Sequence, residues 1–126
     1  MIVGIGTDLV LVSRFEGALE RHGQRLPQRL LAEQERTEYS NASNPARFLA
    51  KRFAAKEAIV KALGTGPRQM RWTDICVSHN ELGQPLVALT GGAADRARER
   101  GIHRWHLSIS DERDQVLAFA IAETSG

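Results

Sequence analysis

PARFLAKRFAAKEAIVKALGTG, residues 45–66, decides the fold, because it predicts one long helix with recognisable ends. Asn44 suits the N-cap position, Pro45 suits the first helical position, and Gly64 suits the left-handed position after a last turn. Most residues between them are Ala, Leu, Lys, Arg and Glu, which are strong helix formers. The rest of the chain is expected to pack around this helix.

The two sides of the predicted helix differ at 100° per residue. One broad side predicts a core contact and carries Phe48, Leu49, Phe53, Ile59, Val60 and Leu63. The other side carries Arg47, Lys51, Glu57 and Lys61, flanked by Ala50, Ala54, Ala58 and Ala62. Glu57 and Lys61 are four residues apart, which suits a surface ion pair that stabilises the helix by about 0.2–0.5 kcal/mol. The alternative is a carboxylate and an ammonium on a floor of alanines, with space for a bulky ligand above.

Arg52 and Lys56 do not fit this division, because both project from the middle of the apolar side. Long basic side chains can extend to solvent at the edge of a core. The alternative is that this side meets an anionic ligand or another subunit. Spacing leaves both interpretations open.

Length and composition predict a single domain that covers residues 1–126. A hydrophobic content of 42% and a charged content of 25% are ordinary for a globular protein. No apolar run approaches the ~20 residues of a membrane span, and the N-terminus lacks the pattern of a signal peptide. The single cysteine, Cys76, excludes an intramolecular disulfide, and a net charge of +2 does not favour nucleic acid. We expect a cytoplasmic protein that binds neither nucleic acid nor membrane.

Residues 2–12 predict a strand with two unlike faces. Gly4, Gly6 and Asp8 share one face. Glycine weakens a strand, so this face predicts a close approach by another part of the molecule or by a ligand. Asp8 alone is most simply a turn or capping acid near the end of the strand.

The segment after this strand predicts helices and a basic cluster. Residues 13–16 match a capping box that opens a helix ending near Gly23, and residues 30–39 predict a second helix. The cluster contains Arg14, Arg21, Arg25 and Arg29. It is either a solvated helix face or a docking surface for an acidic partner.

The C-terminal half predicts strands at residues 75–78 and 86–90, a helix at 93–100, and a hairpin of strands 105–110 and 115–123. A hairpin makes the sheet mainly antiparallel. The order of elements predicts an α+β domain in which a long central helix packs on this sheet.

Two separated motifs resemble the paired signature of the phosphopantetheinyl transferases. The first is GIGTDL at residues 4–9, and the second is RFAAKEA at residues 52–58, followed by Lys61 and Ala62. The short chain and the LGTG continuation at residues 63–66 are similar to the small bacterial type, the holo-[acyl-carrier-protein] synthases. The resemblance implies the phosphopantetheinyl transferase fold. It also implies transfer of the 4′-phosphopantetheine arm of coenzyme A to a serine of apo acyl carrier protein, with release of adenosine 3′,5′-bisphosphate.

The resemblance also implies roles for particular residues. Asp8 and Glu57 match the family's Mg²⁺ ligands, and a hard dication with oxygen ligands would neutralise the pyrophosphate. Lys61 matches the lysine that reaches the reacting phosphate. Glu57, acting through a metal-bound water, is the preferred base for the serine proton, and Lys61 is the other candidate.

Coenzyme contacts follow from the same resemblance. Arg52 matches a position that contacts coenzyme phosphate, Arg47 and Lys56 are further candidates, and Gly64, Thr65 and Gly66 would approach by backbone groups. Many family members carry a histidine where this chain has Asp111, so no histidine is assigned to the site.

The small type of this family typically forms a homotrimer with active sites between subunits. Arg52 would then serve a site completed by the neighbouring chain. The basic cluster, through Arg14, Arg21 and Arg25, would dock the acidic carrier protein.

Two rival functions remain at this point. The first is a non-catalytic oligomeric module that binds an anionic nucleotide through Arg52, Lys56 and the Gly-Thr-Gly loop without metal. The second is a metal-dependent phosphohydrolase that uses the same two carboxylates on water. Neither accounts for the long-range pairing of the two motifs.

Overall fold

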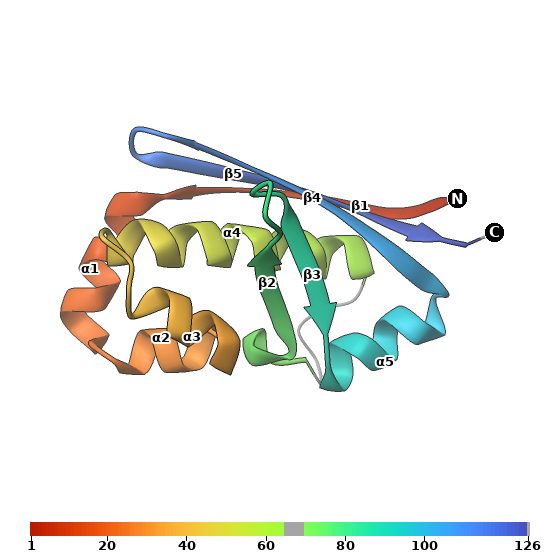
Figure 1. The fold of residues 1–126 in the computed structure, drawn as a ribbon, viewed down its shortest axis with the longest axis horizontal. Coiled ribbons are helices and arrows are strands. Elements are labelled where there is room, and N and C mark those ends of the chain that lie inside the picture. The colour runs from red at the N-terminus through yellow and green to blue at the C-terminus, as the bar shows by residue number, and fades with distance from the viewer. Residues whose placement is uncertain (65–69, 126) are drawn as a thin grey trace.

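A long helix lies across one face of a three-stranded sheet in the computed structural model, which describes residues 1–64 and 70–125 (Figure 1). This helix, α4, spans Pro45–Leu63. The Asn44 side-chain oxygen accepts a hydrogen bond from the Arg47 backbone N–H at 3.2 Å, and Gly64 adopts a left-handed φ of 73°. Both predicted ends of the helix are therefore confirmed. Thr65 and Gly66 lie outside the described residues.

The larger sheet is antiparallel and combines both ends of the chain. Its strands are β1 (Ile2–Leu11), β4 (Ile102–Glu112) and β5 (Gln115–Thr124), in the order β1-β5-β4. The two-residue turn between β4 and β5 places Arg113 at a φ of 52°. A smaller sheet pairs β2 (Ile75–His79) with β3 (Pro85–Leu89), and β2 also contacts α4. The predicted α+β class, with its mainly antiparallel sheet, is confirmed.

Shorter helices pack at the two ends of α4. Helices α1 (Val12–His22), α2 (Arg25–Leu30) and α3 (Glu33–Tyr39) gather near its start, and α5 (Gly91–Glu99) lies near its end (Figure 1). A 3-10 turn at Trp72–Asp74 leads directly into β2. The helix predicted over residues 30–39 is wrong at its start, because Leu31 is extended and separates α2 from α3.

The predicted capping box at the start of α1 is also wrong. The N-cap position is Leu11, which has no capping side chain. Ser13 instead donates its backbone N–H and its hydroxyl to the two carboxylate oxygens of Asp114, each at 2.9 Å. The first turn of α1 is therefore held by the β4–β5 turn.

Glycines in β1 allow α4 to approach the sheet unusually closely. A Cβ atom on Gly4 would lie 1.9 Å from the carbonyl oxygen of Ala62, and one on Gly6 would lie 2.0 Å from that of Ala58. The predicted close approach to this face is thus made by the backbone of α4.

The alanine row of α4 faces the sheet and is fully buried, as are three alanines of β5. The buried residues of this contact are Ala50, Ala54, Ala58, Ala62, Ala118, Ala120 and Ala122. Small side chains on both surfaces are what let the helix and the sheet approach so closely. The alternative of an alanine floor beneath a bulky ligand is therefore wrong.

The opposite side of α4 builds the second part of the core. Leu49, Ile59 and Leu63 are completely buried, and Phe53 packs between Phe15 of α1 and Trp72, with ring centroids 5.3 and 5.5 Å apart. This side carries the apolar contact that the periodicity predicted.

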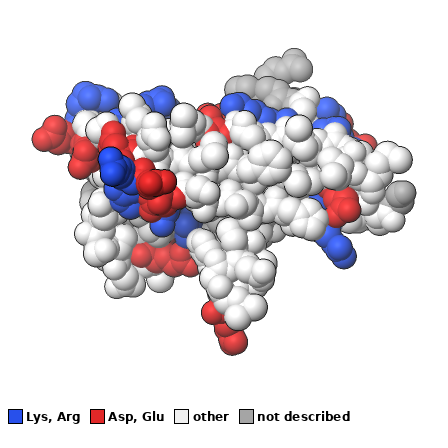
Figure 2. Space-filling view, turned by 90° about the horizontal axis from the view of Figure 1, so that it is seen from above, with Lys and Arg blue, Asp and Glu red and all other residues white. Residues whose placement is uncertain are grey.

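The outer face of the larger sheet carries exposed apolar side chains. Ile5 is 61% exposed, Leu9 59%, Leu117 44% and Phe119 38%. Viewed from above the sheet, the surface shows a broad area without charged residues, with charges around its edges (Figure 2). Within the described ranges, we find no helix with the length and hydropathy that a membrane crossing requires.

Candidate functional site

The close contact between β1 and α4 brings the two sequence motifs together. Asp8 follows Gly6 on the strand face that meets α4, and a Cβ atom on Gly6 would lie 2.9 Å from Cβ of Lys61. The Lys61 ammonium donates to the Thr7 carbonyl at 2.8 Å and lies 3.4 Å from Asp8 Oδ1. Asp8, Glu57 and Lys61 form one cluster, which we call the acid–lysine cluster.

Burial, and repulsion by Asp8, raise the pKa of Glu57 in this cluster. Partial burial of the carboxyl group is the larger cause, and the negative charge of Asp8 adds to it, while Lys61 and Arg14 act in the opposite direction. The charged form of Glu57 is therefore less favourable than that of an ordinary carboxylate, and a further cation beside Glu57 would offset that cost.

The oxygen atoms of the cluster fit a hard divalent cation. Asp8 Oδ2 is buried and has no hydrogen-bond partner within residues 1–64 and 70–125. Mg²⁺ usually takes one or two protein carboxylates and completes its shell with water and substrate phosphate. Within the same described ranges, we find no group of three or more His, Cys, Asp or Glu side chains placed to hold a metal.

A cavity of about 680 Å³ lies at the other end of α4. Arg47, Lys51 and Arg52 line it from the helix, together with residues 82–84 of the β2–β3 connection, the start of β3 at Pro85, and strand β4. A volume between about 300 and 1,000 Å³ is typical of cofactor and ligand sites. We call this space the basic cavity.

The basic cavity and the acid–lysine cluster are separate within one chain. None of Asp8, Glu57 and Lys61 lines the cavity. The predicted metal ligands are therefore brought together, and so are the predicted coenzyme cations Arg47 and Arg52, but the two sets do not meet in a single subunit.

Each cation of the basic cavity contacts a carboxylate. Arg47 pairs with Asp111, and the ammonium of Lys51 lies 3.2 Å from the same carboxylate. Arg52 is 3% exposed and pairs with Glu38 and with Glu35, the latter at 3.2 Å. Its guanidinium also lies 4.4 Å above the ring of Phe48, which holds it against the cavity wall.

Comparison with known proteins gives the family. The sequence matches the model of the 4′-phosphopantetheinyl transferase superfamily over residues 4–120. The chain belongs to this superfamily. It is 55% identical to a holo-[acyl-carrier-protein] synthase of Laribacter hongkongensis over 124 residues, which cover 98% of this chain and 99% of the relative.

Solved transferase structures share the fold along the whole chain. The holo-[acyl-carrier-protein] synthase of Neisseria meningitidis superposes with a TM-score of 0.91 at 44% identity, covering 98% of this chain and all of that one. A holo-(acyl-carrier-protein) synthase of Bacillus anthracis, in complex with CoA (3′,5′-ADP), gives a TM-score of 0.81 at 34% identity and covers 99% of each chain. The transferase fold predicted from the two motifs is confirmed.

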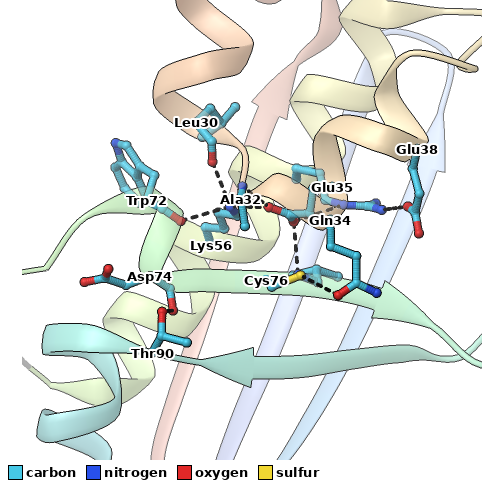
Figure 3. A network of polar contacts seen from close by, with 12 residues as sticks. Leu30, Ala32, Gln34, Glu35, Glu38, Lys56, Trp72, Asp74, Cys76 and Thr90 are labelled. Atoms are coloured by element: carbon cyan, nitrogen blue, oxygen red, sulfur yellow. Dashed lines mark hydrogen bonds and ion pairs between the residues drawn. The ribbon is translucent and has the colours of Figure 1, made fainter.

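The structure places Lys56, a predicted coenzyme contact, in the core of the protein and outside the lining of the basic cavity. Its side chain is fully buried, and its ammonium donates to Glu35 Oε1 at 2.6 Å and to the carbonyls of Leu30 at 2.7 Å and Trp72 at 2.9 Å (Figure 3). All three ammonium hydrogens are taken. Burial lowers the pKa of Lys56, and the charge of Glu35 opposes that shift. The assignment of Lys56 to coenzyme binding is corrected to a structural one.

Glu35 is the partner that sequence reasoning missed. Its carboxylate is completely buried and also accepts the backbone N–H group of Ala32 at 2.9 Å (Figure 3). It accepts the backbone N–H group of Val77 at 3.0 Å as well. The available signal was the pair of basic residues on the apolar side of α4, because buried cations require a buried acid. Lys56 therefore does not extend to solvent, and the observed partner of its ammonium is a buried acid of the same chain, in place of the anionic ligand considered from the sequence.

The predicted docking arginines line two neighbouring cavities. Arg14 and Arg21 of α1 line a cavity of about 290 Å³, whose floor includes Phe15, Phe53 and Trp72. Arg25, at the start of α2, lines an adjacent hollow. The three arginines thus share one end of the molecule, and Arg14 also influences Glu57 electrostatically.

Gly64, at the end of α4, lies beside the side chain of Arg100. The Arg100 guanidinium donates to the carbonyls of Ala62 at 3.0 Å and Leu63 at 2.9 Å. These bonds satisfy free carbonyls of the last helical turn. The approach of Gly64, Thr65 and Gly66 to a coenzyme stays a prediction.

Proposed function

We propose that this chain transfers 4′-phosphopantetheine from coenzyme A to a serine of apo acyl carrier protein, giving holo acyl carrier protein and adenosine 3′,5′-bisphosphate. The observation that carries the proposal is the acid–lysine cluster, in which the two motifs of the superfamily meet. Full-length relatives that bear the name holo-[acyl-carrier-protein] synthase support it, and one solved relative is in complex with coenzyme A.

Mg²⁺ is the proposed cofactor, with Asp8 and Glu57 as its protein ligands. Two observations support this assignment: one Asp8 oxygen has no hydrogen-bond partner in the described part of the chain, and the pKa of Glu57 is raised. When bound, the cation would neutralise negative charge on the pyrophosphate of coenzyme A.

Lys61 and Glu57 are the proposed catalytic residues. In the transfer, the serine hydroxyl oxygen forms a bond to phosphorus, the bond to the bridging pyrophosphate oxygen breaks, and adenosine 3′,5′-bisphosphate leaves. The Lys61 ammonium would stabilise charge on the reacting phosphates, as positioned cations do in phosphoryl transfer. Glu57 is the preferred general base for the serine proton, and Lys61 is the other candidate.

A homotrimer would unite the two halves of the site. The acid–lysine cluster and the basic cavity are separate in one chain, so an active site between subunits could take each half from a different protomer. The exposed Ile5, Leu9 and Phe119 on the sheet suit burial in such an interface. Replacement of Phe119 by Lys would then give a monomer by light scattering. An unchanged molar mass would count against this interface.

The basic cavity is the proposed site for coenzyme phosphates, through Arg47 and Arg52. The end of the molecule that carries Arg14, Arg21 and Arg25 is the proposed docking surface for the carrier protein, which is acidic around its modified serine. We place the reaction in the cytoplasm.

The deciding experiment is the intact mass of apo acyl carrier protein after incubation with this chain, coenzyme A and Mg²⁺. We expect a gain of one phosphopantetheine that disappears with chelator and with Glu57→Ala. Glu33→Ala, an exposed glutamate on α3, is the matched control and should retain transfer. Coenzyme binding without any mass gain would favour a binding module. Coenzyme cleavage without a carrier protein would favour a hydrolase.

A further inference from the structure

Asp111 contacts two cations of the basic cavity at once. Its carboxylate, near the end of β4, pairs with the guanidinium of Arg47 and lies 3.2 Å from the ammonium of Lys51. Arg47 also donates to the carbonyl oxygen of Arg113 in the adjoining turn. The three charged side chains are 23–39% exposed, so water still reaches them.

Among the residues that the structure describes, the charges that line the basic cavity nearly cancel. Arg47, Lys51 and Arg52 contribute three positive charges, and Glu38 and Asp111 contribute two negative ones. Arg52 is buried against Glu35 and Phe48, so its position is fixed by the core of the protein. For Arg47 and Lys51, Asp111 is the carboxylate that the structure places in salt-bridge range.

An anionic group entering the cavity therefore meets cations that already hold a carboxylate. Carboxylate and phosphate oxygens make the same charge-assisted hydrogen bonds with arginine and lysine. A phosphate placed on Arg47 and Lys51 would also lie close to Asp111, whose charge repels it. In water, one unit charge at ~4 Å changes an interaction free energy by about 1 kcal/mol, which is about fivefold in affinity.

We propose that Asp111 limits the affinity of the basic cavity for the phosphate groups of coenzyme A, by occupying the position on Arg47 and Lys51 that a phosphate would take. The identity of the ligand rests on the proposed function, whereas the ion pairs do not. The opposite role, in which Asp111 orients Arg47 for the coenzyme, requires that loss of the carboxylate weakens binding.

Isothermal titration calorimetry with coenzyme A tests the proposal. The variants are Asp111→Asn, which keeps the shape of the side chain, and Glu112→Gln, which changes the net charge equally at an exposed neighbour that does not line the cavity. We expect the dissociation constant of Asp111→Asn to fall by about fivefold or more. That of Glu112→Gln should stay within about twofold of the parent, because exposed charges are screened.

Salt dependence provides a second readout. In about 1 M salt, where the screening length is ~3 Å, the gain of Asp111→Asn should shrink. Circular dichroism would establish that both variants are folded. A dissociation constant for Asp111→Asn equal to or higher than that of Glu112→Gln would overturn the proposal. If the parent transfers phosphopantetheine in that case, the proposed function stands. Absence of coenzyme binding to the parent would overturn both.

Discussion

Gly6→Ala should separate catalysis from folding, because Gly6 lies where β1 touches α4 beside the acid–lysine cluster. The added Cβ would lie 2.0 Å from the Ala58 carbonyl oxygen and 2.9 Å from Cβ of Lys61. Ordinary van der Waals contact begins at 3.4 Å, so strand and helix must move apart by about 1.4 Å. The obstacle is helix backbone, which cannot rotate away as a side chain can.

The displacement would act on stability and activity by different amounts. Overpacking a core typically costs about 1–3 kcal/mol of unfolding free energy. The same movement shifts Asp8 relative to Lys61 and Glu57, and a ~1 Å misplacement of catalytic groups can cost about 100-fold in rate. We expect Gly6→Ala to be folded, measurably less stable, and about 100-fold slower in carrier-protein modification.

Two assays check this prediction. Urea denaturation gives the change in unfolding free energy, and intact-mass kinetics at saturating coenzyme A gives kcat. Gly17→Ala in α1 is the matched control, because among the described residues its Cβ would meet only the end of the flexible Arg21 side chain, at 3.3 Å. It should increase stability by about 0.4–1 kcal/mol. A Gly6→Ala variant with parental stability and parental kcat would refute the close-contact argument.

Three further predictions concern charge. Lys56→Met leaves the Glu35 carboxylate buried without its cation, so we expect a loss of about 3–5 kcal/mol in urea denaturation, and a loss below 1 kcal/mol would contradict the buried pair. The pKa of Glu57 is raised in the folded state, so without metal Glu57 makes the unfolding free energy fall as pH rises from about 4.3 through that raised pKa. Asp8→Asn should reduce this dependence of the unfolding free energy on pH, measured by denaturation at a series of pH values. An unchanged dependence would exclude the repulsion between Asp8 and Glu57. Arg21→Glu should weaken carrier-protein binding in titration calorimetry while coenzyme binding is retained, and equal loss of both would refute the docking assignment.

Local signals made α4 predictable from the sequence. Asn44, Pro45 and Gly64 act within one turn of the helix ends, so no tertiary information is needed to place them. The glycines of β1 also predicted a close approach, since a residue without Cβ has few other uses inside a strand. The pairing of Asp8 with Glu57 came from the resemblance of the motifs, and the structure supplies the contact surface that brings them together.

Misassigned features were those whose partner lies far along the chain. The hydrogen bonds that hold Ser13 come from Asp114, 101 residues away, and a capping box within residues 13–16 was the only local alternative. Lys56 finds Glu35 in a separate helix, 21 residues earlier. The alanines of α4 could face either a ligand or a backbone, because small residues permit both. Only the sheet packed against them decides between these alternatives.

The turn between β4 and β5 fastens two helices that carry different parts of the proposed site. Asp114 holds the start of α1, and the Arg113 carbonyl, with neighbouring Asp111, holds Arg47 at the start of α4. Hairpin tips are usually preferred places for inserting tags, labels or whole domains. In this protein an insertion between Arg113 and Asp114 would unfasten both helices, so a fluorescent label or affinity tag belongs elsewhere on the chain.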